Sequence, residues 1–125
     1  MVFDTDIFIW LQRGNQKAAA AIEHAKERYL SIYSYMELLQ CAQDKKQHAV
    51  IKDFLNKFEF IVLPLTENIG HRALIYLEEY AFVSQLGAGD ALIAATTVEN
   101  NMALASGNAK HFKPLKDLKF HVFTP

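Results

Sequence analysis

Short apolar segments alternate with longer amphipathic segments along the 125-residue chain, and this alternation limits the folds open to it. The short segments are apolar on both faces, as the strands of a buried parallel sheet are. Strands that alternate with helices build a parallel sheet covered by helices on both sides. We therefore predict an α/β fold, a three-layer α/β/α domain with a short central parallel sheet. The predicted strands are residues 1–4, 29–33, 60–63, 103–105 and 119–123, and the predicted helices are 7–12, 16–28, 34–43, 48–58, 67–82 and 90–101.

The composition fits one domain spanning residues 1–125, because no repeat, linker or low-complexity tract divides the chain. The single cysteine, Cys41, excludes an internal disulfide and suits a reducing compartment. The first residues carry two acids where a secretion signal would carry basic residues. No apolar run approaches the roughly 20 residues that a membrane helix needs. We therefore expect a cytoplasmic protein with no membrane segment.

Acidic and amide side chains follow several of the predicted strands. Asp4 and Asp6 come after the first, Glu37 stands one helical turn beyond the end of the second, and Asp90 begins a later helix. Ser106 and Asn108 follow the strand at 103–105. In open parallel sheets, ligands bind outside the carboxyl ends of the strands. These side chains are therefore expected at one edge of the sheet, where they form a candidate site.

Clustered carboxylates repel one another and raise one another's pKa values, so such a site needs a compensating positive charge. A divalent cation supplies it, and carboxylate and amide oxygens are the donors that Mg²⁺ and Mn²⁺ take. No Cys/His cluster has the spacing of a zinc site. The sequence therefore favours Mg²⁺ or Mn²⁺ as the cofactor.

Most of these acids also have a purely structural interpretation. Ser34 and Glu37 fit the S-x-x-E capping box, and Asp90 fits a first-turn acid of its helix. Asp6 is expected to cap the helix at 7–12, and Asn108 stands in a turn, where asparagine is common. Asp4 is the hardest to explain structurally, because it ends a buried strand and has no evident capping role.

Four sequence blocks, in this order, resemble the PIN-domain ribonucleases, in particular the VapC-type toxins of bacterial toxin–antitoxin pairs. They are Phe3-Asp4-Thr5-Asp6-Ile7, Ser34-Tyr35-Met36-Glu37-Leu38, Gly89-Asp90-Ala91-Leu92-Ile93-Ala94-Ala95 and Ser106-Gly107-Asn108-Ala109-Lys110-His111-Phe112. The first block is weakly specific by itself, whereas the last two together are much more telling. The resemblance spans essentially the whole chain and implies a PIN-like nuclease domain.

The resemblance also implies roles for individual residues. Asp4, Glu37 and Asp90 match the three acidic metal-site positions, with Asp4 and Asp90 as metal ligands and Glu37 as a ligand or the group that positions the attacking water. Asn108 lies near the position where many family members carry a fourth acid, so the number of bound ions stays open. The supporting positions, by this match and by their place beside the acids, are Thr5, Asp6, Ser106 and Asn108. His111 and Phe112 match a structural pair, and we expect His111 to be hydrogen-bonded and half-buried.

The implied activity is metal-dependent hydrolysis of RNA phosphodiesters, in which the cation lowers the pKa of a water molecule and stabilises charge on the phosphate. The implied partners are RNA, a small cognate antitoxin and a second copy of the chain. Candidate phosphate contacts are Arg13, Lys45, Lys46 and Lys110, although for each of them alone a solvated surface charge is the favoured interpretation. Candidate residues for an apolar antitoxin groove are Tyr33, Tyr35, Met36, Leu39 and Phe54, although for any one of them packing in the core is the favoured interpretation.

Two alternatives remain open at this point. A haloacid-dehalogenase-type phosphatase would use Asp4 and Asp6 as its D-x-D pair, but Ala94 and Ala95 stand where its further acid is expected, and Glu37 would have no role. A non-catalytic PIN-like module would bind a partner or RNA without cleaving it. The net charge of −1 agrees with this second alternative, since the chain lacks the basic surplus of proteins that bind nucleic acid by charge alone.

Overall fold

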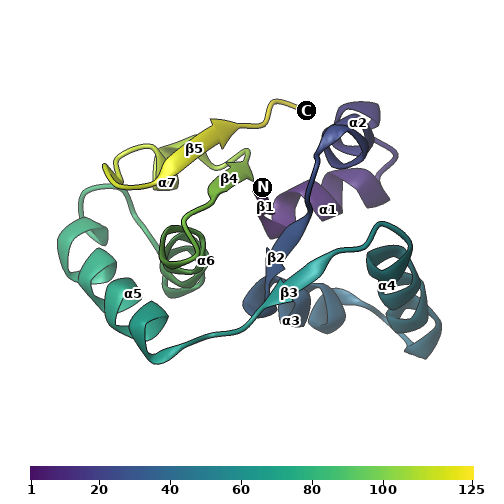
Figure 1. The fold of residues 1–125 in the computed structure, drawn as a ribbon, viewed down its shortest axis with the longest axis horizontal. Helices are drawn as coiled ribbons and strands as arrows, with labels where there is room; N and C mark the ends of the chain where they lie inside the picture. Colours follow the sequence, from purple (N-terminus) through teal and green to yellow (C-terminus); the bar gives the residue numbers. More distant parts are fainter.

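The computed structural model describes residues 1–125, and five short strands alternate in it with seven helices (Figure 1). The strands are β1 (Val2–Phe3), β2 (Tyr29–Ser31), β3 (Ile61–Leu63), β4 (Ala103–Ser106) and β5 (Lys119–Val122). The helices are α1 (Thr5–Gln12), α2 (Gln16–His24), α3 (Ile32–Cys41), α4 (Lys45–Lys57), α5 (Glu67–Tyr80), α6 (Ala88–Glu99) and α7 (Ala109–Phe112). No helix combines the length and the hydropathy needed to cross a membrane.

The five strands form one parallel sheet in the order β3-β2-β1-β4-β5. The chain builds outward from β1 through β2 to β3, and then crosses to the other side of β1 to add β4 and β5. The order of the strands therefore reverses between β1 and β4. In open α/β sheets a crevice opens at the carboxyl end of such a reversal, and ligands bind there. The predicted parallel sheet is confirmed.

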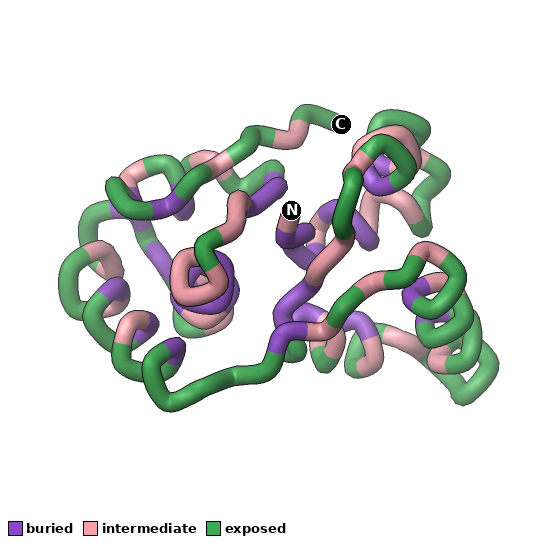
Figure 2. The backbone as a smooth tube through the Cα atoms, in the orientation of Figure 1, coloured by how far each residue is buried: buried purple, intermediate pink, exposed green.

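Two separate hydrophobic cores lie on the two faces of the sheet, which gives the predicted three layers. Successive residues of a strand point to opposite faces, so Val2 and Leu104 join one core while Phe3 and Ala105 join the other. The first core includes side chains of α5, α6 and α7, and the second includes side chains of α1, α2, α3 and α4. In Figure 2 the buried segments accordingly follow the central strands and the inward sides of the helices.

Several boundaries differ from the prediction because of local capping. Helix α3 begins at Ile32 rather than at residue 34, because the Ser31 hydroxyl accepts a hydrogen bond from the Tyr33 N–H at 3.1 Å and caps the helix. The predicted capping box of Ser34 and Glu37 is therefore wrong. Asp44 caps α4 and starts it at Lys45. The sequence pattern also gave no sign of the one-turn helix α7.

Candidate active site

The structure brings the predicted acids together in one acidic pocket at the carboxyl ends of the central strands. Asp4, Asp6, Glu37 and Asp90 line it with Thr5, Tyr33, Gly89, Asn108, Ile9 and Ile93. These residues come from the start of α1, from α3, from the first turn of α6 and from the turn after β4. The structure therefore brings the four predicted acids and Asn108 together, while their chemical roles remain proposals.

Asp4 is the most deeply buried acid of the pocket, with 3% of its surface exposed. It caps α1, because its Oδ1 accepts a hydrogen bond of 2.7 Å from the Thr5 N–H. Its Oδ2 accepts bonds from the Ser106 hydroxyl at 2.7 Å and the Asn108 amide at 3.4 Å. The expectation that Asp4 has no capping role is wrong. Burial, and then the neighbouring charge of Asp6, raises the pKa of Asp4 to about 7.

Asp6 does not cap α1, contrary to the prediction, because Asp4 occupies the N-cap position and Asp6 lies in the first turn of the helix. Its Oδ2 accepts a hydrogen bond of 2.8 Å from the Gly107 N–H, and so joins α1 to the turn after β4. A Cβ at position 107 would lie 2.9 Å from that oxygen, so glycine permits this close approach. The other oxygen, Oδ1, is buried without a partner, and burial raises the pKa of the carboxyl.

Glu37 is held in the pocket by Thr5, whose hydroxyl donates to Glu37 Oε1 at 2.7 Å. Its second oxygen, Oε2, receives no hydrogen bond from the protein and remains available to a ligand or a water molecule. Ser34, one turn earlier on α3, is fully buried and its hydroxyl has no partner. Ser34 therefore neither caps α3 nor orients Glu37 through a hydrogen bond.

Asp90 combines the structural role expected for a first-turn acid with a place in the pocket. Its Oδ2 accepts a hydrogen bond from the Gly87 N–H at 3.3 Å, which closes the first turn of α6. The same oxygen lies 2.9 Å from Nδ1 of His111. His111 is hydrogen-bonded and partly buried, as expected, but no sequence signal identified Asp90 as its partner.

Tyr33 closes one side of the pocket against Gly89. A Cβ at position 89 would lie 2.7 Å from the Tyr33 ring and hydroxyl, so only glycine permits this contact. Burial, and then the charges of Glu37 and Asp90, raises the pKa of the Tyr33 phenol, which agrees with a hydroxyl close to both acids. Tyr33 was predicted as a residue of an apolar groove, and the structure places it in the acidic pocket instead.

Gly89→Ala is expected to displace Tyr33 without unfolding the protein. The contact atoms are the end of a partly exposed side chain that can rotate, and alanine favours the helix by about 1 kcal/mol over glycine. We expect the free energy of unfolding to change by less than about 1 kcal/mol, measured by urea denaturation. A crystal structure of the variant should show a moved Tyr33 ring. A loss of stability above about 2 kcal/mol would contradict this interpretation.

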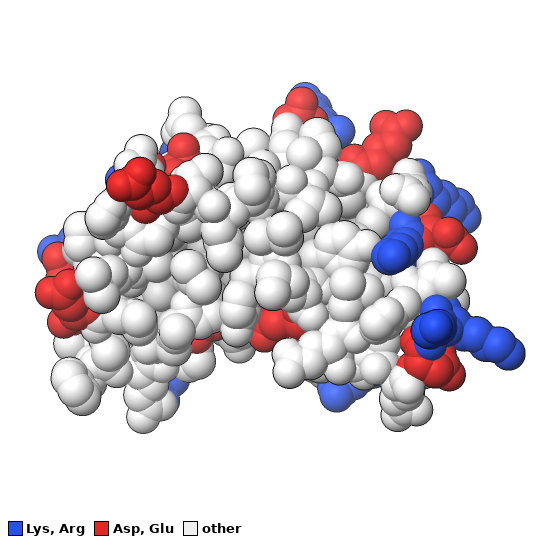
Figure 3. Space-filling model, turned by 90° about the horizontal axis from the view of Figure 1, so that it is seen from below, with Lys and Arg blue, Asp and Glu red and all other residues white.

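The four predicted basic contacts lie outside the acidic pocket. Arg13 ends α1 with its guanidinium 5.4 Å from the centre of the Trp10 ring, and Lys45 and Lys46 begin α4. Lys110 donates to Gln85 at 2.9 Å. Figure 3 shows one face of the molecule, on which most of the visible basic atoms gather at the right-hand end near α4. No lysine or arginine lines the pocket itself.

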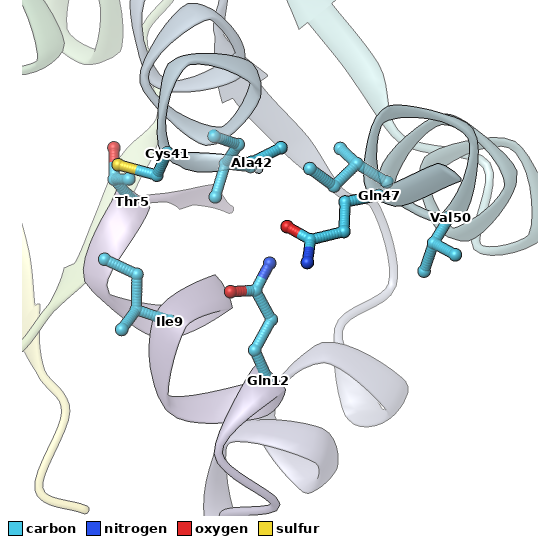
Figure 4. Close-up of a pocket in the computed structure, with 9 residues that line it drawn as sticks. Thr5, Ile9, Gln12, Cys41, Ala42, Gln47 and Val50 are labelled. Atoms are coloured by element: carbon cyan, nitrogen blue, oxygen red, sulfur yellow. The ribbon is translucent and has the colours of Figure 1, made fainter. Parts of the chain in front are cut away.

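An apolar groove between α1, α3 and α4 continues from the acidic pocket. It is lined by Phe8, Leu11, Leu38, Val50, Ile51, Phe54 and Leu55, and Val50 is 67% exposed. Figure 4 shows an adjoining, mostly apolar part of this groove, in which the amides of Gln12 and Gln47 point toward one another. Thr5 and Ile9 line both this part of the groove and the acidic pocket, so the two are adjacent.

Only one of the five predicted groove residues, Phe54, lines this groove. Tyr35 and Leu39 pack against the second core, and Met36 is 58% exposed outside the groove. The groove assignment is therefore wrong for four of the five residues, and core packing, the favoured interpretation of each residue taken alone, holds for Tyr35 and Leu39. The face that α3 turns toward α4 could not be deduced from its apolar spacing.

The donor atoms of the acidic pocket fit a hard divalent cation. They are carboxylate and amide oxygens, Asp6 Oδ1 is buried without a partner, and no positive side chain lines the pocket. Asp4, Asp6, Glu37 and Asp90 are the residues that could hold the ion. In their present rotamers, no three acidic, histidine or cysteine side chains are close enough together to hold one metal ion. Binding an ion would therefore require a rotation of side chains within the pocket.

The buried acids make the stability of the metal-free protein depend on pH. Folded Asp4 keeps its proton up to a pKa of about 7, whereas in the unfolded chain it loses the proton near 3.8. The folded state therefore binds more protons than the unfolded state between these values, and the free energy of unfolding falls as the pH rises through them. Asp6 contributes with the same sign.

Asp4→Asn is expected to remove the Asp4 part of this dependence, because asparagine can cap α1 without titrating. The free energy of unfolding of the variant minus that of the wild type should increase by roughly 2–4 kcal/mol as the pH rises from 4 to 8. Urea denaturation of both proteins in EDTA across this pH range measures the gain. A stability difference that does not change with pH would contradict the assignment.

The comparison with known proteins agrees with this geometry. Residues 1–117 match the family model of the PIN domain. A toxin–antitoxin complex from Klebsiella pneumoniae contains a chain that is 26% identical, with a TM-score of 0.80 over 94% of this chain and 93% of that one.

Two further solved structures share the fold at lower identity. VapBC-1 from nontypeable Haemophilus influenzae is 21% identical, with a TM-score of 0.80 and 98% of each chain covered. VapBC2 from Rickettsia felis bound to a promoter DNA fragment is 17% identical, with a TM-score of 0.80 over 99% of this chain and 100% of that one. A comparison with curated protein sequences found no match. Because the family model covers nearly the whole sequence, this chain belongs to the PIN domain family.

Proposed function

We propose that residues 1–125 form a single PIN-like nuclease domain, a metal-dependent endoribonuclease that acts in the cytoplasm as the toxin of a toxin–antitoxin pair. The observation that carries the proposal is the acidic pocket, in which Asp4, Asp6, Glu37 and Asp90 from three separate segments meet at the reversal point of the sheet. Membership of the PIN domain family and the VapBC structural neighbours support the same activity.

The proposed mechanism assigns a separate task to each acid. Asp4 and Asp90 would hold a Mg²⁺ or Mn²⁺ ion, which when bound would lower the pKa of a water molecule and offset charge on the phosphate. Glu37 would orient the attacking water through Oε2, the oxygen that receives no hydrogen bond from Thr5. The Ser106 hydroxyl and the Asn108 amide hold the Asp4 carboxylate in place as neutral donors.

RNA binding is proposed to depend on the rim rather than on the pocket. The pocket is lined by acids and repels phosphate until a cation neutralises part of its charge. Arg13, Lys45, Lys46 and Lys110 are the proposed phosphate contacts outside it. The modest net charge of −1 then agrees with an enzyme that binds RNA tightly only when it is loaded with metal.

We place the antitoxin in the groove between α1, α3 and α4. An amphipathic helix can bury its apolar side chains against Phe8, Val50 and Phe54, and a basic side chain that follows can reach the adjacent acidic pocket. The chain in the Klebsiella pneumoniae structure is described as part of a toxin–antitoxin complex. A second copy of this chain is proposed to cover exposed apolar side chains of α5, among them Leu74 and Ile75.

Divalent metal is expected to raise the melting temperature of the partner-free protein. A ligand that binds only the folded state at 100 times its Kd adds about 2.7 kcal/mol, which corresponds to a shift on the order of 10 °C for a chain of this size. Thermal unfolding with Mn²⁺ and with EDTA measures the shift, and Asp90→Asn should reduce it. Equal melting temperatures in Mn²⁺ and EDTA would favour a module without a metal site.

RNA hydrolysis is tested by incubating end-labelled structured RNA, and DNA of the same sequence, with partner-free protein and Mn²⁺. Cleavage of RNA alone supports the proposal. Metal binding without cleavage of any RNA would favour the non-catalytic module instead. The haloacid-dehalogenase-type phosphatase loses its support, because the family match is to the PIN domain and Glu37 has a place among the acids.

A further inference from the structure

His111 lies beside the acidic pocket and contacts one of its acids without lining the pocket itself. Its Nδ1 is 2.9 Å from Asp90 Oδ2, and the two side chains are 31% and 22% exposed. An ionised carboxylate only accepts hydrogen bonds, so Nδ1 carries a hydrogen and donates it to Asp90. This is a side-chain contact between two helices, α6 and α7, that are joined through β4.

The contact with His111 determines which carboxylate oxygen of Asp90 remains available to a ligand. Oδ2 receives the His111 Nδ1–H and also the Gly87 N–H, the latter at the long distance of 3.3 Å. Oδ1 receives no hydrogen bond from the protein. Without His111, only the long bond from Gly87 would hold the carboxylate, and its two oxygens could exchange places by rotation about the last side-chain bond.

Packing and a backbone hydrogen bond hold the backbone of His111 in place, and this keeps its imidazole donor next to Asp90. Its neighbour Phe112 is fully buried in the first core, with its ring 5.8 Å from that of Phe120. At the other end of the helix, Asn108 accepts the His111 N–H through its carbonyl at 3.1 Å and donates its side-chain amide to Asp4. The segment from Ser106 to Phe112 therefore contacts both proposed metal ligands.

We propose that His111 is a positioning residue, which orients the Asp90 carboxylate so that Oδ1 faces the cation. This inference rests on the proposed function of Asp90 as a metal ligand. Hydrogen bonds from the surrounding protein to ligating carboxylates typically change metal affinity 10- to 100-fold when they are removed. His111 is assigned no contact with RNA and no proton transfer to it.

The test compares His111→Leu with His111→Asn, because the asparagine amide can place its Nδ2 near the position of the histidine Nδ1. His111→Leu is expected to weaken Mn²⁺ binding about 10-fold or more by isothermal titration calorimetry. His111→Asn should recover most of this loss, and it should also recover kcat for RNA cleavage with little change in KM. His71→Leu is the matched control, since His71 is exposed and pairs only with Glu67 at 3.6 Å.

The outcomes separate this inference from the proposed function. Wild-type Mn²⁺ affinity in His111→Leu would overturn the role of His111, and so would an asparagine variant that is folded in EDTA but binds as weakly as the leucine variant. Asp90→Asn, measured in the same way, reports on the proposed function. If that variant loses affinity while His111→Leu does not, only the inference about His111 fails. If neither the wild type nor any variant binds Mn²⁺, both fail.

Discussion

Asp4→Asn is expected to abolish metal-dependent RNA cleavage, by a factor of 10³ or more, while the protein remains folded. The substitution removes one negative charge from the proposed metal site and keeps the size of the side chain. Asparagine can still cap α1 through its amide oxygen, and the NH₂ group that replaces Oδ2 can donate to the Ser106 hydroxyl oxygen, so the local structure is expected to remain. Cleavage of labelled RNA by both purified proteins, at the same Mn²⁺ concentration, measures the effect.

The control for this variant is an acid that lies outside the pocket. Asp44 caps α4 through the Gln47 N–H at 2.9 Å and does not line the acidic pocket, so Asp44→Asn should cleave RNA like the wild type. Circular dichroism establishes that all three proteins are folded. Asp4→Asn activity within tenfold of the wild type would remove Asp4 from the metal site.

Phe112→Ala is expected to cause the largest loss of stability in the region of the site. The phenylalanine side chain is fully buried in the first core and ties α7 to the sheet through Phe120. Truncation of a buried phenylalanine costs about 3–5 kcal/mol, a large part of the stability of a domain of this size. Urea denaturation measures the loss as a lower midpoint with an unchanged slope.

Phe82→Ala provides the matched control, because Phe82 is fully exposed. The same substitution there should change the free energy of unfolding by less than about 0.5 kcal/mol. A Phe112→Ala variant as stable as Phe82→Ala would show that α7 is not anchored through this side chain. It would also weaken the view that α7 is a fixed support for Asp4 and Asp90.

The sheet could be predicted because its signal is local. The inner strands β1, β2 and β4 are short, largely apolar runs buried on both faces of the sheet, so Val2 and Phe3 can both be apolar although they point to opposite cores. The start of α3 was missed because residues 29–33 have high strand propensity, which the capping bond from Ser31 overrides at Ile32. Helix α7 was missed because a single turn has no periodicity to detect.

The membership of the site could be predicted, since strand ends gather at one edge of a parallel sheet. The hydrogen bonds within it could not, because they join residues that are distant in sequence. Ser106 and Asp4 are 102 positions apart, and His111 and Asp90 are 21 apart. Residue type alone therefore suggested that Asp6 caps α1. In the structure Asp4 is the N-cap, and Asp6 accepts a hydrogen bond from the Gly107 N–H.

The rate of RNA cleavage as a function of Mn²⁺ concentration, for the partner-free wild type beside Asp90→Asn, shows whether hydrolysis depends on metal held at the acidic pocket. We expect no cleavage in EDTA, a wild-type rate that rises with Mn²⁺ to saturation, and no comparable rise for the variant. Cleavage that persists in EDTA, or an Asp90→Asn curve that matches the wild type, would contradict metal-dependent hydrolysis at the acidic pocket.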